Sequence, residues 1–93
     1  GYSSAASDVY KRQEFTTCDL RNSDFNDCKL TSIAFTNCEL VEAEFSHTPL
    51  RGIDLSDSHI EGIHVNLPDI RGAIVSTHQV MDLTSLLGLV IKD

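Results

Sequence analysis

Large apolar residues recur every five positions along most of the chain. From Glu14 to Ala73 the sequence divides into twelve pentads, and the second residue of each is Phe, Leu, Ile or Val. The fifth residue is mostly small or apolar, and the other positions are mainly polar. A helix needs apolar residues about every 3.6 positions and a strand every second position, so this period predicts neither. The expected core ladder is Phe15, Leu20, Phe25, Leu30, Phe35, Leu40, Phe45, Leu50, Leu55, Ile60, Val65 and Ile70.

A short fixed period sustained over this length indicates an internal repeat and a β-solenoid. The stretches CDLRN, SDFND and IDLSD, which begin at Cys18, Ser23 and Ile53, resemble the pentapeptide repeat family. The resemblance implies an all-β fold, a right-handed quadrilateral β-helix with one pentad on each side and about three coils in all. It implies that residues 14–75 form the β-helix and that residues twenty apart share a column.

The last part of the chain, residues 76–93, breaks the ladder and predicts a cap. Ser76 and Gln79 have the spacing of a capping box. A short C-terminal helix is expected over residues 77–87, closed by Gly88, with a short strand at residues 89–91. The apolar stripe of this helix has two interpretations, packing on the last coil or a homodimer face at the C-terminal end. The stripe is Val80, Leu83 and Leu87.

Residues 1–13 do not continue the ladder from Glu14. The stretch SSAASDVYKRQ, residues 3–13, resembles translated sequencing-adapter read-through at the edge of a reading frame. We therefore expect a non-native or disordered extension. On this interpretation the natural protein would continue with further coils on the N-terminal side.

The charge narrows the classes of ligand. The 93 residues carry a formal charge of −7, and the stretch from Glu14 to Ala73 contains eleven acidic and four basic residues. This balance argues against a nucleic acid or a membrane surface as ligand, because both attract Lys and Arg. It permits a basic protein partner. No apolar run is long enough to span a membrane, and no signal peptide is visible. The odd number of cysteines favours a reducing compartment, so we expect a cytoplasmic protein.

Three cysteines lie ten residues apart, at Cys18, Cys28 and Cys38. An odd number argues against a disulfide scaffold, and the spacing lacks the close pairs typical of zinc sites. All three occupy the small position of the pentad, where Cys acts as a small hydrophobe. We expect three reduced, buried thiols, with no metal and no cofactor.

The C-terminal part is similar to one branch of the family, the Qnr-type quinolone-resistance proteins. The similarity rests on DIRG at residues 69–72, Gln79, LLGLVI at residues 86–91, and TPLRGIDLSDSHIEGIHV from Thr48. It implies an acidic dimeric DNA mimic that binds DNA gyrase or topoisomerase IV and protects them from fluoroquinolones. Several members of that branch carry projecting loops, and no insertion interrupts residues 14–73.

The acidic residues are expected to form vertical rows on the solenoid, continued by His59 and His64. These rows have two interpretations, a surface for a basic partner or a solvated face. The candidate partner-binding residues are Asp19, Asp24, Glu39, Glu44, Asp54 and Asp57.

Catalysis is not expected. The chain lacks a Gly-rich phosphate loop and a nucleophile elbow, and a solid-cored solenoid offers no ligand-sized pocket. Two functions remain open, a topoisomerase-binding DNA mimic and a general protein-interaction scaffold.

Overall fold

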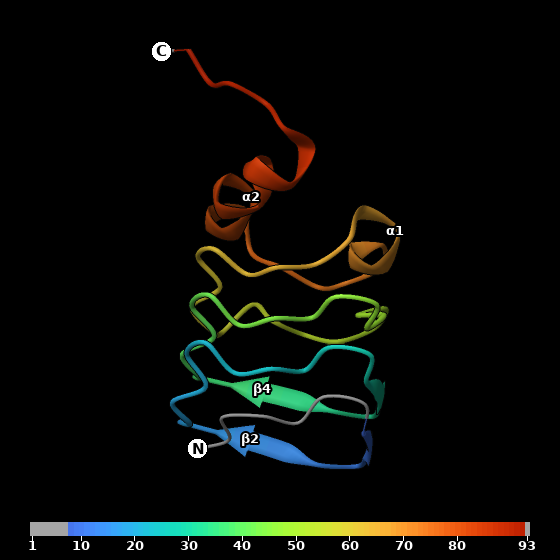
Figure 1. Ribbon diagram of the computed structural model, residues 1–93. Helices are drawn as coiled ribbons and strands as arrows, with labels where there is room; N and C mark the ends of the chain where they lie inside the picture. Colours follow the sequence, from blue (N-terminus) through green and yellow to red (C-terminus); the bar gives the residue numbers. More distant parts are fainter. Residues whose placement is uncertain (1–7, 93) are drawn as a thin grey trace.

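Stacked coils and a helical cap form the part of the chain that the computed structural model describes, residues 8–92 (Figure 1). The coils rise from the N-terminal end, and the helices lie across the opposite end. The molecule measures 41 × 24 × 22 Å. Its long axis is the direction in which one coil is stacked on the next.

Four short strands lie in the first coils: β1 (Val9–Lys11), β2 (Glu14–Thr16), β3 (Lys29–Thr31) and β4 (Ala34–Thr36). They form two parallel pairs, β1 with β3 and β2 with β4. In both pairs each residue lies opposite the residue twenty positions later, such as Phe15 opposite Phe35. Isolated bridges keep the same offset along the stack, the last joining Asp54 to Ile74. The described coils therefore contain twenty residues each, as a β-helix of pentapeptide repeats requires.

Each side of a coil ends in a tight turn. The N–H of the small residue donates to the carbonyl three positions earlier, as from Ser23 to Leu20 and from Ile53 to Leu50. The residue before the small one often has a positive φ, which costs energy for any residue but Gly. Only the later coils place Gly at such corners, at Gly52, Gly62 and Gly72. The other residues are Arg12, Thr17, Asn22, Asp27, Ser32, Asn37, Glu42 and His47.

The core is a column of the second pentad residues with the small residues between them. Most ladder residues are almost completely buried, whereas Leu30 and Ile70 are half-buried at the margin. Aromatic rings stack along the axis, Phe15 on Phe35 and Phe25 on Phe45, with centroids 5.3 Å apart in both pairs. The two stacks meet edge to face. Such offset and edge contacts are favourable for aromatic rings.

The N-terminal boundary differs from the expected one at residue 14. β1 pairs in register with β3, and Tyr10 lies opposite Leu30. The Tyr10 ring is buried and contacts Phe15 and Phe25 edge to face. Residues 8–13 thus continue the coil, because Tyr10 fills the large apolar position. The expected disorder of residues 1–7 lies outside the described residues.

A single helical turn, α1 (Leu67–Ile70), forms one corner of the last coil. Pro68 lies in its first turn, where the missing N–H removes no helical bond. The N–H groups of Asp69 and Ile70 both donate to Asn66 O. The pentad pattern continues through this turn, so it did not predict the helix.

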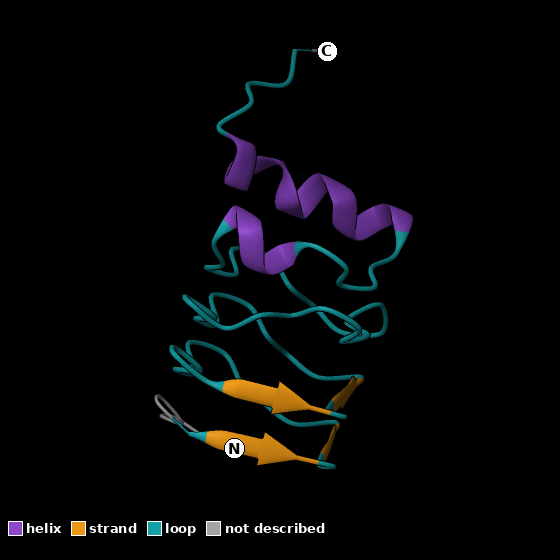
Figure 2. Cartoon of the chain, turned by 90° about the vertical axis from the view of Figure 1, so that its right-hand side faces the viewer, coloured by secondary structure: helices purple, strands orange, loops and turns teal. Residues whose placement is uncertain are grey.

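The cap contains α2 (Thr77–Leu83) and the 3₁₀ turn η1 (Thr84–Leu87), which span the residues of the expected helix (Figure 2). Gly88 ends the turn with a φ of 67°. The prediction of a strand at residues 89–91 is wrong. These residues form no strand, and Val90 is 94% exposed. The C-terminal segment leads away from the coils (Figure 2), so no strand edge is beside it.

Candidate interaction surfaces

The acidic residues form columns on the outside of the coils. Asp19 lies opposite Glu39, which in turn lies opposite His59. Asp24 lies opposite Glu44, which lies opposite His64. We call these columns the Asp19 row and the Asp24 row. The side chains are exposed or half-buried, so all of them are accessible to solvent.

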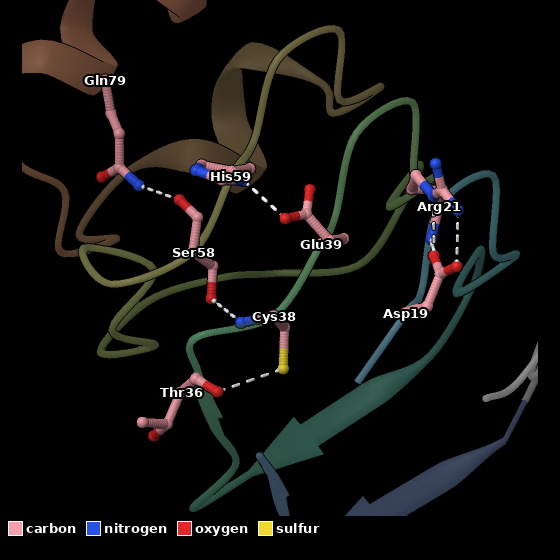
Figure 3. Close-up of polar contacts among 8 residues, drawn as sticks. All are labelled: Asp19, Arg21, Thr36, Cys38, Glu39, Ser58, His59 and Gln79. Atoms are coloured by element: carbon pink, nitrogen blue, oxygen red, sulfur yellow. Dashed lines mark hydrogen bonds and ion pairs between the residues drawn. The ribbon is translucent and has the colours of Figure 1, made fainter. Parts of the chain in front are cut away.

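Both carboxylates of the Asp19 row contact basic side chains of this chain (Figure 3). Arg21 donates through Nε and Nη2 to the two oxygens of Asp19, at 2.8 and 2.7 Å. These bonds, and a third from the Arg21 backbone N–H, lower the pKa of Asp19 to about 2. Further along, His59 Nδ1 lies 2.7 Å from Glu39 Oε1. The Asp19 carboxylate is therefore already paired with a cation, and Glu39 already has a hydrogen-bonding partner.

Two more histidines face carboxylates of the coil beside them. His64 Nε2 lies 3.3 Å from Glu42 Oε2, and His47 Nδ1 lies 3.8 Å from Asp27 Oδ1. A histidine carries charge only when protonated. These pairs are exposed, and exposed ion pairs contribute little to stability.

The Asp24 row lacks such partners. Asp24 Oδ1 accepts the backbone N–H of Asn26 at 2.9 Å. Among residues 8–92, neither Asp24 nor Glu44 forms an ion pair. Stacked like charges about 4.8 Å apart repel one another. Of the two rows, the Asp24 row is therefore the more available to a partner.

Asp54 and Asp57 lie on another side of the last coil. Asp54 Oδ1 accepts the backbone N–H of Ser56 at 2.9 Å and its hydroxyl at 2.6 Å. Both bonds favour the carboxylate and lower the pKa of Asp54. Asp57 lies at the next corner and borders a cleft beneath the cap.

That cleft has a volume of about 310 Å³ and lies between the last coil and α2. It corrects the expectation that the solenoid has no pocket of ligand size. The coil itself is solid, and the overhang of α2 creates the space. Its lining is polar and includes Asp57, His59, Glu61, His78 and Asp82.

The sequence analysis missed a basic surface. One side of the stack consists of residues 9–13, 29–33, 49–53 and 69–73, and we call it the basic face. Parallel pairing of β1 with β3 joins its lower half, and the bond from Gly52 N–H to Gly72 O joins its upper half. Five of the seven Lys and Arg residues lie on it, and all five are exposed: Lys11, Arg12, Lys29, Arg51 and Arg71. Sorting charges by their position in the twenty-residue coil would have revealed it.

The small inward positions form a second, buried hydrogen-bonded column. Thr48 Oγ1 accepts Cys28 N–H at 3.0 Å and donates to Phe25 O. Ser58 Oγ likewise accepts Cys38 N–H and donates to Phe35 O. Polar side chains at this position thus bond to the neighbouring coil, which a hydrophobic interpretation of the position had not foreseen.

All three cysteines are free thiols. Cys28 and Cys38 are buried, and burial raises the pKa of the Cys38 thiol. Cys18 is only half-buried, contrary to expectation. It lies in the first described coil, so no described small residue covers it from the N-terminal side.

Part of the apolar stripe of the cap packs on the core, and part of it is exposed and free for a dimer contact. Leu83 packs against the core, together with Leu86. Val80 and Leu87 are 51% and 57% exposed. Gln79, whose expected structural role was in the capping box, is buried and also bonds to the last coil. The exposed apolar side chains at this end also include Leu67, Ile74, Met81, Leu89, Val90 and Ile91.

A comparison of the sequence with models of protein families agrees with the stacked coils of the structure. The family model described as "Pentapeptide repeat region" matches residues 10–74. The chain belongs to the pentapeptide repeat family. The match begins within β1, which supports including residues 10–13 in the repeat. Membership in this family suggests a protein-interaction scaffold, and such proteins are generally non-catalytic.

Comparison with curated proteins gave no match. Within residues 8–92, no helix is both long and apolar enough to cross a membrane.

Proposed function

We propose that the protein is a non-catalytic DNA mimic that binds DNA gyrase or topoisomerase IV and protects these enzymes from fluoroquinolones. The observation that supports this most directly is the Asp24 row. Its two carboxylates are held one coil apart, and neither forms an ion pair within residues 8–92. A regular row of anions on a rod is complementary to a basic surface that otherwise holds DNA phosphates.

The arrangement suits binding better than stability. Repulsion between Asp24 and Glu44 costs the isolated protein free energy. A Lys or Arg from a partner would offset that repulsion and form charge-assisted hydrogen bonds. The Asp19 row gains less from a partner, because Arg21 and His59 already contact its carboxylates.

A gyrase supercoiling assay with ciprofloxacin tests the proposal. Added protein should restore supercoiling, and Asp24→Lys with Glu44→Lys should weaken the recovery at least tenfold. A control with the same change in net charge is Asp69→Lys with Asp82→Lys, which reverses acidic charge away from the row. Equal protection by the charge-reversed and wild-type proteins would exclude the row as the binding surface.

The alternative is a general interaction scaffold with another partner. It is favoured by the uninterrupted repeat, since no loop projects between residues 14 and 73 to engage a topoisomerase. Absence of protection together with unaltered gyrase activity at saturating protein would support the scaffold.

We also propose a homodimer through the C-terminal end. Val80, Leu87 and the apolar side chains near them are exposed at one end of the rod. Removing such a patch from water favours association. Val80→Asp with Leu87→Asp should give a monomer in analytical ultracentrifugation, and a persisting dimer would place the interface elsewhere.

The remaining expectations are part of the same proposal. The coils form a right-handed quadrilateral β-helix, and the protein acts in the cytoplasm. Three free thiols suit a reducing compartment.

A further inference from the structure

The basic face carries more positive than negative charges, and its cations are not paired with acidic side chains of the described residues. Five exposed cations lie on it, and Asp69 is its single acidic residue. Among the described residues, none of the five cations forms an ion pair. Asp8 borders the face, and its Oδ1 accepts the backbone N–H of Val9. In a protein of charge −7, this concentration on one side separates the two signs.

The upper half of the face holds two arginines on neighbouring coils. Arg51 and Arg71 are twenty residues apart, and the bond from Gly52 N–H to Gly72 O fixes their coils. A Cβ atom on Gly72 would lie 3.0 Å from Arg51 Cγ, so Arg51 packs along the next turn. Two stacked guanidinium groups repel one another, as the stacked carboxylates do. An anionic partner would offset this cost.

The lower half carries Lys11, Arg12 and Lys29 and is held in the same column. β1 and β3 place Lys29 opposite Val9 and Lys11 opposite Thr31. Between the two halves, Cys28 N–H bonds to Thr48 and Cys38 N–H bonds to Ser58. Both bonds keep the twenty-residue register. Cations are therefore presented along the whole described stack.

The same molecule carries the matching anions. The Asp24 row has the same rise per coil as the basic face, about 4.8 Å, because both follow the strand spacing. Equal repeat distances let the two carboxylates of one row meet cations on two neighbouring coils of the other face in register. Arg and carboxylate groups also form paired, bidentate hydrogen bonds.

We propose that the basic face binds the Asp24 row of a second copy of this chain, with the two rods side by side. The contact joins two different surfaces, so it is heterologous. It is distinct from the apolar contact at the C-terminal end and does not rest on the proposed function. A basic partner and a second copy would compete for the Asp24 row.

The net charge of the two copies opposes this contact only at low salt. At about 0.15 M salt the Debye length is about 8 Å, whereas the molecule is at least 22 Å across. Charges on the far sides are then screened, and the facing rows dominate. At about 1 M salt the facing rows are screened too. Association should therefore be strongest at intermediate salt.

A nucleic acid fits the basic face less well. The chain has an isoelectric point near 4.8, whereas domains that bind nucleic acids are typically basic. A long polyanion would extend past the face and meet the acidic sides of the coil.

Sedimentation velocity on the Val80→Asp, Leu87→Asp background tests the proposal without the C-terminal contact. Rising protein concentration should give species larger than a monomer at about 0.15 M salt and fewer at both lower and higher salt. Arg51→Glu with Arg71→Glu should weaken association at least tenfold, as should Asp24→Lys with Glu44→Lys. Thermal unfolding by circular dichroism checks that each variant is folded.

Mixing the two charge-reversed proteins supplies the decisive arm. The first retains an acidic row and the second retains a basic face, so the mixture should associate although neither protein does alone. A monomer at all salt concentrations would overturn the proposal. So would association that survives both reversals, or duplex DNA that binds the face at about 0.15 M salt without any self-association.

Discussion

The side-chain amide of Gln79 donates to the carbonyl oxygen of Leu55 at 2.6 Å. One coil earlier the equivalent carbonyl, Phe35 O, accepts the Ser58 hydroxyl, and two coils earlier Phe15 O accepts the Cys38 thiol. A further coil would place a small inward residue at this carbonyl. The chain forms the cap here instead, and the Gln79 side chain makes the bond that this residue would have made. It also donates to Ser58 O at 2.6 Å, while its Oε1 accepts Ser76 N–H (Figure 3 shows the contact with Ser58).

Removing the Gln79 amide should lower the stability of the protein, because the cap is bonded to the last coil through it. Gln79→Leu keeps the size of the side chain but removes the donor to the carbonyl of Ser58 and one of the two donors to the carbonyl of Leu55. We expect a loss of about 3 kcal/mol in the free energy of unfolding, measured by urea denaturation. The exposed neighbour variant His78→Ala should change it by less than about 0.5 kcal/mol. Equal stability of both variants would contradict the terminating role of Gln79.

The buried hydroxyl of Thr48 should matter more than its methyl group. Thr48→Val preserves shape but removes the hydroxyl's bonds to Cys28 N–H and Phe25 O, at a cost of about 2 kcal/mol. Thr48→Ser keeps the hydroxyl and loses only a methyl group, at a cost of about 1 kcal/mol. Urea denaturation should therefore rank the Val variant below the Ser variant. The reverse order would mean that the position is purely hydrophobic.

The corners of the early coils contain removable strain. Thr17 has a φ of 52° although it is β-branched, and such residues strongly disfavour this conformation. Asn occupies the same kind of corner at Asn22 and Asn37. Thr17→Asn should raise the free energy of unfolding by about 0.5 to 1 kcal/mol, because Asn tolerates a left-handed conformation.

The converse variant at a later corner provides the control. Gly52 has a φ of 76°, and a Cβ atom there would have no neighbour within 4 Å. Gly52→Ala should therefore lose about 1 kcal/mol through backbone strain alone. If thermal unfolding shows no change for either variant, the corner conformations are not strained in solution.

The Asp19–Arg21 pair should make stability depend on acid pH. The pKa of Asp19 is lowered to about 2 from a usual value of 3.8. The contribution of the pair is therefore fully present above the unfolded pKa near 3.8 and is lost as pH falls toward 2. Arg21→Ala should return the pKa of Asp19 toward 3.8 in a carboxyl-detected NMR titration. Asp54, whose pKa is lowered by Ser56, should titrate as before. A low Asp19 value in Arg21→Ala would assign the shift to the backbone instead.

The period of five was sufficient to predict which side chains form the core, since Leu20, Phe25 and Leu40 are completely buried. Two local signals at the cap, Ser76 and Gln79, located the helix. Tyr10 was missed because the ladder was counted from Glu14, although Tyr10 lies five residues before Phe15 and has a similarly large aromatic ring. The strand at residues 89–91 failed because apolar, β-branched residues favour a strand only where an edge is available to pair with.

The charges were harder to interpret than the core. Counting acids in sequence gave the acidic rows, but pairing depends on side-chain reach. Arg21 contacts Asp19 two residues away, and His64 contacts Glu42 twenty-two residues away. The basic face needed the coil length as well as the pentad period, because Lys11 and Arg71 are distant in sequence. The position of a residue within its pentad determines whether its side chain is buried or exposed. Its position within the twenty-residue coil determines on which side of the stack it lies.

The offset of twenty residues also constrains how such a chain can change its length. An insertion of five residues would keep every later apolar residue in the core, because the ladder has that period. It would nevertheless turn all later surface residues onto the next side, so Arg51 and Arg71 would part from Lys29. An insertion or deletion of twenty residues preserves both. Evolution can therefore add or remove whole coils with little change to the surface pattern, while single pentads would rewrite the surface and leave the core intact.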